Sequence, residues 1–162
     1  MAIRQMSMST IYVLLGLVCL LWNVSPYTAW CGDPVRTFVG SEGCKECHET
    51  EYANYEKFTK KSHSFKSITC MKKGLTAVEL IECFKCHTTG YGEPSGFKSE
   101  AETPHLKNAG CEVCHGPGSI HAETEDPEDI KGQLTANDCE RCHSSERVDA
   151  FNYKPLIYGG AH

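Results

Sequence analysis

The sequence predicts a mostly irregular and α-helical fold, in which short helices and long loops wrap around covalently bound cofactors and there is very little β structure. Two observations predict it. A Cys-x-x-Cys-His motif occurs four times, and Val, Leu, Ile and Phe account for only 21 of the 131 residues after residue 31. So few apolar side chains are typical of disordered chains, because they bury too little surface to offset the entropy of the backbone. We therefore expect the cofactors to form the core, and the chain without them to be unfolded.

The four motifs have the pattern that attaches c-type haem. On a helical turn, residues i, i+3 and i+4 share one face, so both thiols can bond the porphyrin while the imidazole binds iron from the same side. A zinc knuckle or a thioredoxin-like dithiol would not require His directly after the second Cys in every copy. The sequence predicts four haem c groups, bonded to Cys44, Cys47, Cys83, Cys86, Cys111, Cys114, Cys139 and Cys142, with His48, His87, His115 and His143 as proximal iron ligands.

Four histidines lie outside the motifs, one for each predicted iron: His63, His105, His121 and His162. Each of them could instead be an ordinary surface histidine. A methionine would compete as the sixth ligand and raise the haem potential, and Met71 is the one candidate after residue 31. Eight histidines for eight axial positions predict four six-coordinate, bis-histidine, low-potential haems.

The first 31 residues have the features of a signal peptide, with Arg4 in a polar start and an apolar run over residues 11–22. Twelve apolar residues are too few to span a bilayer. We expect cleavage near residues 29–32, leaving residues 32–162 as a single exported tetrahaem domain without a membrane span. That domain has 15 Lys and Arg against 21 Asp and Glu. This acidic balance disfavours nucleic acid as a partner.

Two cysteines remain after the motifs and the predicted signal peptide are set aside, namely Cys31 and Cys70. If cleavage falls before Cys31, the two can form a disulfide in an oxidising compartment. If it falls after Cys31, Cys70 is a lone thiol. A buried spectator Cys70 is an equally good interpretation.

The segments around the first two motifs carry local helix and loop patterns. Residues 37–43 are expected to be an extended entry to the first motif. Residues 49–64 are predicted to be helical, because a single stripe at helical spacing holds Tyr52, Tyr55, Thr59 and His63. Residues 67–74 are predicted to be a polar, basic loop. A capping box at residues 76–79 then predicts a short helix that runs into the second motif.

Glycine, proline and acidic residues mark the second half. Residues 88–97 are predicted to be a loop, and residues 103–105 a turn toward the third motif. Gly116-Pro117-Gly118 should end the third motif and let a new turn carry His121. Residues 123–129 hold five acidic side chains, which suit either a solvated segment or a docking patch for a basic partner. A second capping box at residues 135–138 leads into the fourth motif, and residues 144–162 form a C-terminal tail.

Three segments resemble the tetrahaem cytochrome family whose soluble members accept electrons from hydroxylamine oxidoreductase: residues 52–63, residues 83–97 and residues 103–121, the last reading Thr-Pro-His-Leu-Lys-Asn-Ala-Gly-Cys-Glu-Val-Cys-His-Gly-Pro-Gly-Ser-Ile-His. The chain is also similar to the OmcE-type extracellular cytochromes that form filaments. The resemblance covers about residues 40–145. It implies a mostly loop fold with short helices, haems in alternating parallel-stacked and T-shaped pairs, and electron transfer as the activity.

The resemblance also implies that the distal imidazoles include His63, His105 and His121. The soluble type leaves one haem five-coordinate, whereas the fourth spare histidine of this chain disfavours an open iron. A multihaem reductase of nitrite or hydroxylamine, the enzymatic alternative, needs an exchangeable sixth position and nearby acid–base groups. The sequence therefore predicts an electron carrier rather than an enzyme, with other redox proteins or extracellular acceptors as partners.

The C-terminal tail favours a filament subunit over the alternative, a soluble periplasmic shuttle. It is richer in apolar residues than the rest of the exported chain and stops on His162. This imidazole could close the fourth haem of its own subunit, close a haem of a neighbour, or lie in a frayed terminus. Closure in a neighbour would build a head-to-tail homopolymer, and we expect such a filament to be extracellular.

Overall fold

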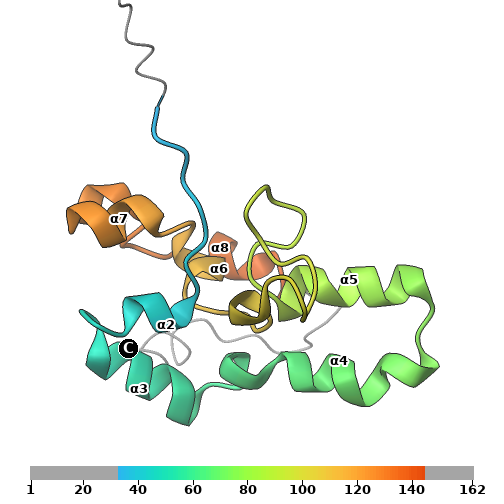
Figure 1. Cartoon of the computed structure of the whole chain (residues 1–162). Helices are drawn as coiled ribbons and strands as arrows, with labels where there is room; N and C mark the ends of the chain where they lie inside the picture. The colour runs from blue at the N-terminus through green and yellow to red at the C-terminus, as the bar shows by residue number, and fades with distance from the viewer. Residues whose placement is uncertain (1–32, 145–162) are drawn as a thin grey trace, which may run out of the picture. The chain divides into compact units, whose positions relative to one another are not determined.

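The computed structural model describes residues 33–144. The predicted signal peptide, Cys31 and the tail from residue 145 with His162 lie outside them. Within this region the chain forms short helices and loops and no strand, which confirms the predicted fold class (Figure 1). The helices are α2 Ser41–Cys44, α3 Glu49–Phe58, α4 Phe65–Met71, α5 Ala77–His87, α6 Glu112–His115, α7 Ser119–Thr124 and α8 Ala136–Glu140, and the 3₁₀ turns are η1 Lys61–His63, η2 Lys72–Gly74, η3 Pro104–Leu106 and η4 Pro127–Asp129. None of the described helices is long and apolar enough to cross a membrane.

Helix α5 begins at the predicted capping box and contains the whole second motif. The Thr76 hydroxyl accepts a hydrogen bond from the Glu79 amide at 3.3 Å, and the Glu79 carboxylate accepts one from the Thr76 amide at 2.8 Å. Two amide donors at the helix start are thereby satisfied. The predicted short helix into the second motif is confirmed.

Two predictions for residues 49–74 were wrong. Helix α3 ends at Phe58, because Thr59 is extended (φ −103°, ψ 138°), and His63 lies in the separate turn η1. The predicted stripe therefore does not continue to His63 on one helix. The basic loop predicted at residues 67–74 is instead helix α4 followed by η2. Helix α4 is stabilised by tertiary packing, since its buried residues are Phe65 and Ile68.

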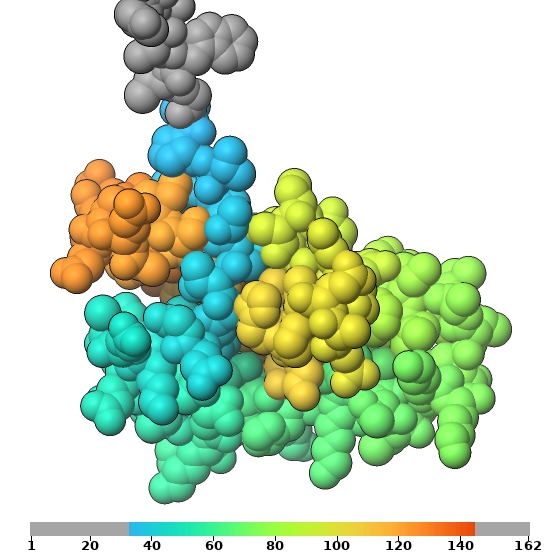
Figure 2. Space-filling model, viewed as in Figure 1, coloured from blue at the N-terminus to red at the C-terminus, as the bar shows by residue number. Residues whose placement is uncertain are grey.

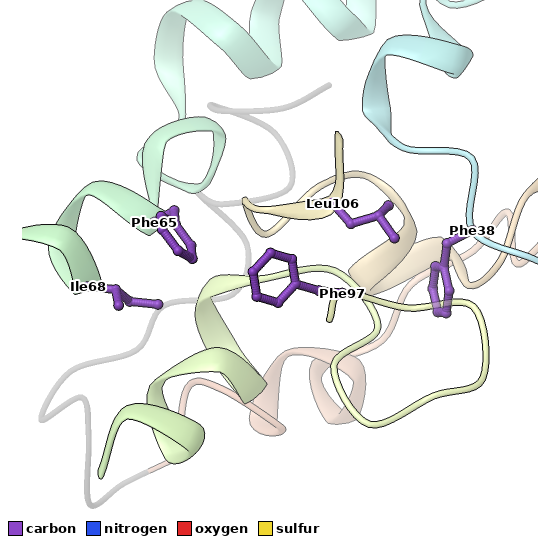
Figure 3. Packing of buried hydrophobic residues seen from close by; sticks show 5 residues of the cluster. All are labelled: Phe38, Phe65, Ile68, Phe97 and Leu106. Carbon is purple, nitrogen blue, oxygen red and sulfur yellow. The ribbon is translucent and has the colours of Figure 1, made fainter. Parts of the chain in front are cut away.

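A small aromatic cluster forms the side-chain core of the described region (Figure 3). It contains Phe38, Phe65, Ile68, Phe97 and Leu106, with Leu106 fully buried. The Phe84 ring on α5 packs against Phe65 and Phe97, with ring centroids 6.2 and 5.3 Å apart. The cluster thus joins α4 and α5 to the loops that carry Phe97 and Leu106. It is small, which agrees with an interior that needs the cofactors.

In the second half of the chain, the loop and helix ends lie where its glycines and prolines predict them. Residues 88–97 form a loop, held by a hydrogen bond from the Phe97 amide to the Thr89 carbonyl at 2.9 Å. Helix α6 ends where Gly116 takes a positive φ of 79°, a conformation that glycine adopts without strain. Helix α7 then carries His121, as predicted. The five acidic residues of segment 123–129 lie at the end of α7, in the bend after it and in η4.

Candidate haem sites

Each Cys-x-x-Cys-His motif is wound into a helical turn. The histidine amide donates to the carbonyl of the first cysteine over 2.9 Å in the first motif, 3.1 Å in the third and 2.9 Å in the fourth. The second motif lies entirely in α5. This geometry places both cysteines and the histidine on one side of each turn, which is the arrangement that thioether attachment and axial ligation require.

Three of the predicted iron ligands have one ring nitrogen already engaged by the backbone. A protonated Nδ1 that donates to a carbonyl leaves Nε2 with the free lone pair that binds a metal. The Nδ1 atoms lie 2.9, 2.7 and 2.8 Å from carbonyl oxygens in the pairs His87–Ser64, His115–Lys131 and His121–Asp126. The chain therefore holds these imidazoles in the tautomer and orientation that suit iron.

The His48 and His121 rings lie near each other with nearly parallel planes. Their ring centroids are 6.1 Å apart and their planes are inclined by 28°. Two metal–imidazole bonds of roughly 2 Å each, together with the half-width of each ring, require about 6 Å between the centroids. The two residues come from the first motif and from α7, so tertiary structure brings them together.

The first and third motifs touch through their leading cysteines. The Cys44 and Cys111 side chains are hydrogen-bonded to each other, which raises the pKa of Cys44 and lowers the pKa of Cys111 to about 7. In this way the fold places the attachment points of two predicted haems next to each other.

The second, third and fourth motifs are also neighbours. Burial and a hydrogen bond to Cys86 raise the pKa of Cys142 to about 12, so the second motif touches the fourth. Burial and the neighbouring Cys114 raise the pKa of Cys139, so the third motif lies beside the fourth. The attachment sites therefore follow the spatial order first, third, fourth, second.

A cavity of about 280 Å³ opens between the second, third and fourth motifs. Its lining combines apolar and charged residues: Phe38, Tyr91 and Val113 are apolar, Lys85, Lys131 and Arg141 are cationic, and Glu93, Glu112 and Asp138 are acidic. Each cation pairs with an acid, in the pairs Lys85–Glu82, Lys131–Asp138 and Arg141–Glu93. Cys114, His115 and Cys142 also border the cavity, so it lies at the predicted attachment points.

Of the other predicted distal ligands, the structure describes His105 and His63. The His105 side chain lies against Gly40, just before α2, where a Cβ on the glycine would sit 3.2 Å from the His105 Cδ2 atom. His63 is exposed in η1. Partial burial and the charge of Lys61 lower the pKa of His143, which favours the neutral imidazole that a metal binds. The predicted ligand His162 lies beyond the residues that the structure describes.

Glu112, the second residue of the third motif, was missed by the sequence analysis. It is 2% exposed, and its carboxylate accepts hydrogen bonds from three backbone amides. The donors are Val39 at 2.9 Å, Gly40 at 2.7 Å and Gly118 at 2.8 Å. It fastens the segment before α2 and the loop before α7 to the third motif. In sequence it looks like Glu140 of the fourth motif, which is exposed, so no local pattern distinguishes them.

The four attachment turns fit haem, and so do the imidazoles that backbone hydrogen bonds orient. The cofactor of this chain is haem c, four per chain. The fold and the sites define a multihaem c-type cytochrome, a class that works in haem-based electron transfer.

The comparisons with known proteins agree with this class of protein. The cytochrome c554 and c-prime family matches residues 43–116, which include the first three motifs. A cytochrome c-554 from Nitrosomonas europaea is 29% identical to the chain over 170 residues, and the match covers 90% of this chain and 72% of that protein. No solved structure matches the chain. The resemblance to filament-forming cytochromes stays a prediction.

Proposed function

We propose that the chain is a periplasmic tetrahaem electron shuttle that accepts electrons from one redox protein and delivers them to another. The observation that carries the proposal is the closeness of the attachment sites: Cys44 lies beside Cys111, Cys86 lies beside Cys142, and one cavity borders the second, third and fourth motifs. Bound haem supplies a reversible one-electron change at its iron. By holding four such groups side by side, the chain would let an electron cross the protein without leaving it.

In this proposal two histidines bind each iron, so no iron has a free position for a small molecule. His48, His87, His115 and His143 serve as proximal ligands, and the distal ligands are His63, His105, His121 and His162. The 6.1 Å separation supports His121 as the distal partner of His48. The backbone carbonyls of Ser64, Lys131 and Asp126 keep three of the imidazoles oriented. An iron with two imidazoles exchanges electrons but offers no site for nitrite or hydroxylamine, which favours a carrier over a reductase.

The similarity to a cytochrome c-554 over 90% of the chain favours the shuttle over the filament subunit. The filament hypothesis rests on the tail and on His162, which lie outside the described residues. It therefore stays a prediction that no observation on residues 33–144 supports.

Two measurements on the purified holoprotein test the proposal. Reductive titration with titanium(III) citrate should consume four electrons per chain, and sedimentation at micromolar concentration should show a discrete small species. Consumption of fewer than four electrons would contradict a tetrahaem carrier. Filaments in negatively stained images would replace the shuttle with the filament subunit.

A further inference from the structure

Segment 57–73 carries a concentrated positive charge in an acidic protein. It contains six lysines and no Asp or Glu, although acidic residues outnumber basic ones by 21 to 15 after residue 31. The six are Lys57, Lys60, Lys61, Lys66, Lys72 and Lys73. All are exposed except Lys61, which is half-buried.

The charge of this segment is not neutralised locally. None of the six lysines forms an ion pair with another residue in the range 33–144. The acidic segment 123–129 belongs to α7 and η4, whereas the lysines follow the end of α3, η1, α4 and η2. In Figure 2 the green α4 runs along the lower edge and the orange α7 lies at the upper left. The positive field of segment 57–73 is therefore directed to solvent.

The same segment exposes apolar side chains. Phe58 is 58% exposed and Met71 is 59% exposed. The Lys57 ammonium lies 4.9 Å from the centre of the Phe58 ring, so a positive charge accompanies this exposed ring. Aromatic and Met contacts within a charged rim are characteristic of protein–protein interfaces.

The segment also adjoins the second haem motif and the residues that lead into the third. The Ser64 carbonyl oxygen lies 2.9 Å from the Nδ1 atom of His87, in the second motif. The Phe65 amide donates to the Asn108 side chain at 3.1 Å, and the Ser64 hydroxyl accepts from the Ala109 amide at 2.9 Å, just before the third motif. A protein that binds here would come close to the haem attachment sites.

We propose that segment 57–73 is the docking surface for an acidic redox partner, in which Lys60 and Lys66 attract the partner's carboxylates and Phe58 makes the apolar contact. The proposal rests on the proposed function, because it assigns one of the shuttle's two partners to a surface. Docking near the second and third motifs gives the electron a short route between the partner and the chain.

A reduced plant-type [2Fe–2S] ferredoxin, which is an acidic one-electron donor, is the probe. One electron leaves the ferredoxin cluster and one ferric iron of the tetrahaem protein becomes ferrous, with no bond made or broken. If the overall charges controlled the encounter, two acidic proteins would repel each other and the rate constant would rise with ionic strength. Docking on segment 57–73 predicts the opposite sign, a rate constant that falls as salt is added.

Two double variants with the same change in net charge locate the surface. Lys60→Glu with Lys66→Glu should lower the rate constant at low salt by about tenfold. Lys98→Glu with Lys107→Glu, which reverses two exposed lysines elsewhere, should change it by less than about twofold. Carbodiimide cross-linking of the wild-type complex should join ferredoxin carboxylates to lysines within residues 57–73, as mapped by peptide mass spectrometry.

Equal effects of the two double variants, or cross-links that map outside residues 57–73, would overturn the docking surface. A wild-type rate constant that rises with salt would overturn it as well. Failure of the shuttle itself is distinguishable, because both variants should still take up four electrons from titanium(III) citrate, a reductant that needs no docking protein.

Discussion

Glu112 buries a carboxylate whose three amide donors come from two segments, the one before α2 and the loop before α7. In Glu112→Gln, one acceptor oxygen becomes an NH₂ group that faces backbone donors. An unmet buried donor costs about 1–3 kcal/mol, so the free energy of unfolding of the holoprotein should fall by at least about 2 kcal/mol. Denaturant unfolding followed by the haem absorbance measures it.

The matched control is Glu140→Gln, the same position of the fourth motif, where the side chain is exposed. It should change stability by less than about 0.5 kcal/mol. Equal effects of the two substitutions would remove the special role of Glu112.

His121 should be the distal ligand of the iron whose proximal ligand is His48, since their rings are 6.1 Å apart. His121→Ala should therefore make one haem of the four high-spin in the oxidised protein. Electron paramagnetic resonance reports the spin state, and added imidazole should restore the low-spin signal. An unchanged low-spin spectrum in the variant would exclude His121 as a ligand.

At the scale of the element, the capping box of α5 supports the helix that carries the second motif. Thr76→Ala removes the hydroxyl that accepts from the Glu79 amide. Loss of an N-cap typically costs about 1 kcal/mol, and we expect a decrease of this size in the free energy of unfolding. Val78→Ala in the same helix is the control, because Val78 is 70% exposed and should contribute little. A Thr76 variant as stable as the Val78 variant would show that the cap is dispensable.

The elements that could be predicted from the sequence are those with local causes. The capping box at Thr76 and the turn at Gly116 depend on neighbouring residues, and both are where the sequence placed them. Helix α4 was missed because only Phe65 and Ile68 of its residues are buried apolar side chains, and two positions make no clear periodic pattern. Contacts with residues far along the chain, such as the Phe65–Phe97 ring pair, stabilise it. Its helical state therefore depends on tertiary structure.

The candidate sites divide in the same way. The cysteines and proximal histidines are local motifs, so the sequence could nominate them directly. Which distal imidazole faces which motif depends on the fold, and only the structure brings His121 to His48. The burial of Glu112 and the contact between Cys44 and Cys111 have the same tertiary origin.

At the scale of the whole molecule, the small side-chain core implies that haem supplies much of the interior. Changing Cys111 and Cys114 to Ala removes the thioether tether of the third haem. The loss of stability should exceed the ~2–5 kcal/mol of a large core truncation. Limited proteolysis and circular dichroism test this, with Cys70→Ala as a control because Cys70 is exposed and outside the motifs. A compact, protease-resistant double variant would show that the chain folds without that haem.

The central claim is that four haems with closed irons make this chain an electron carrier. Magnetic circular dichroism of the oxidised holoprotein at neutral pH, recorded before and after adding nitrite and cyanide, tests it most directly. The account predicts four low-spin bis-histidine haems and no spectral change on adding either ligand. A high-spin ferric band that shifts with nitrite would contradict it, because it would show an iron with an exchangeable sixth position.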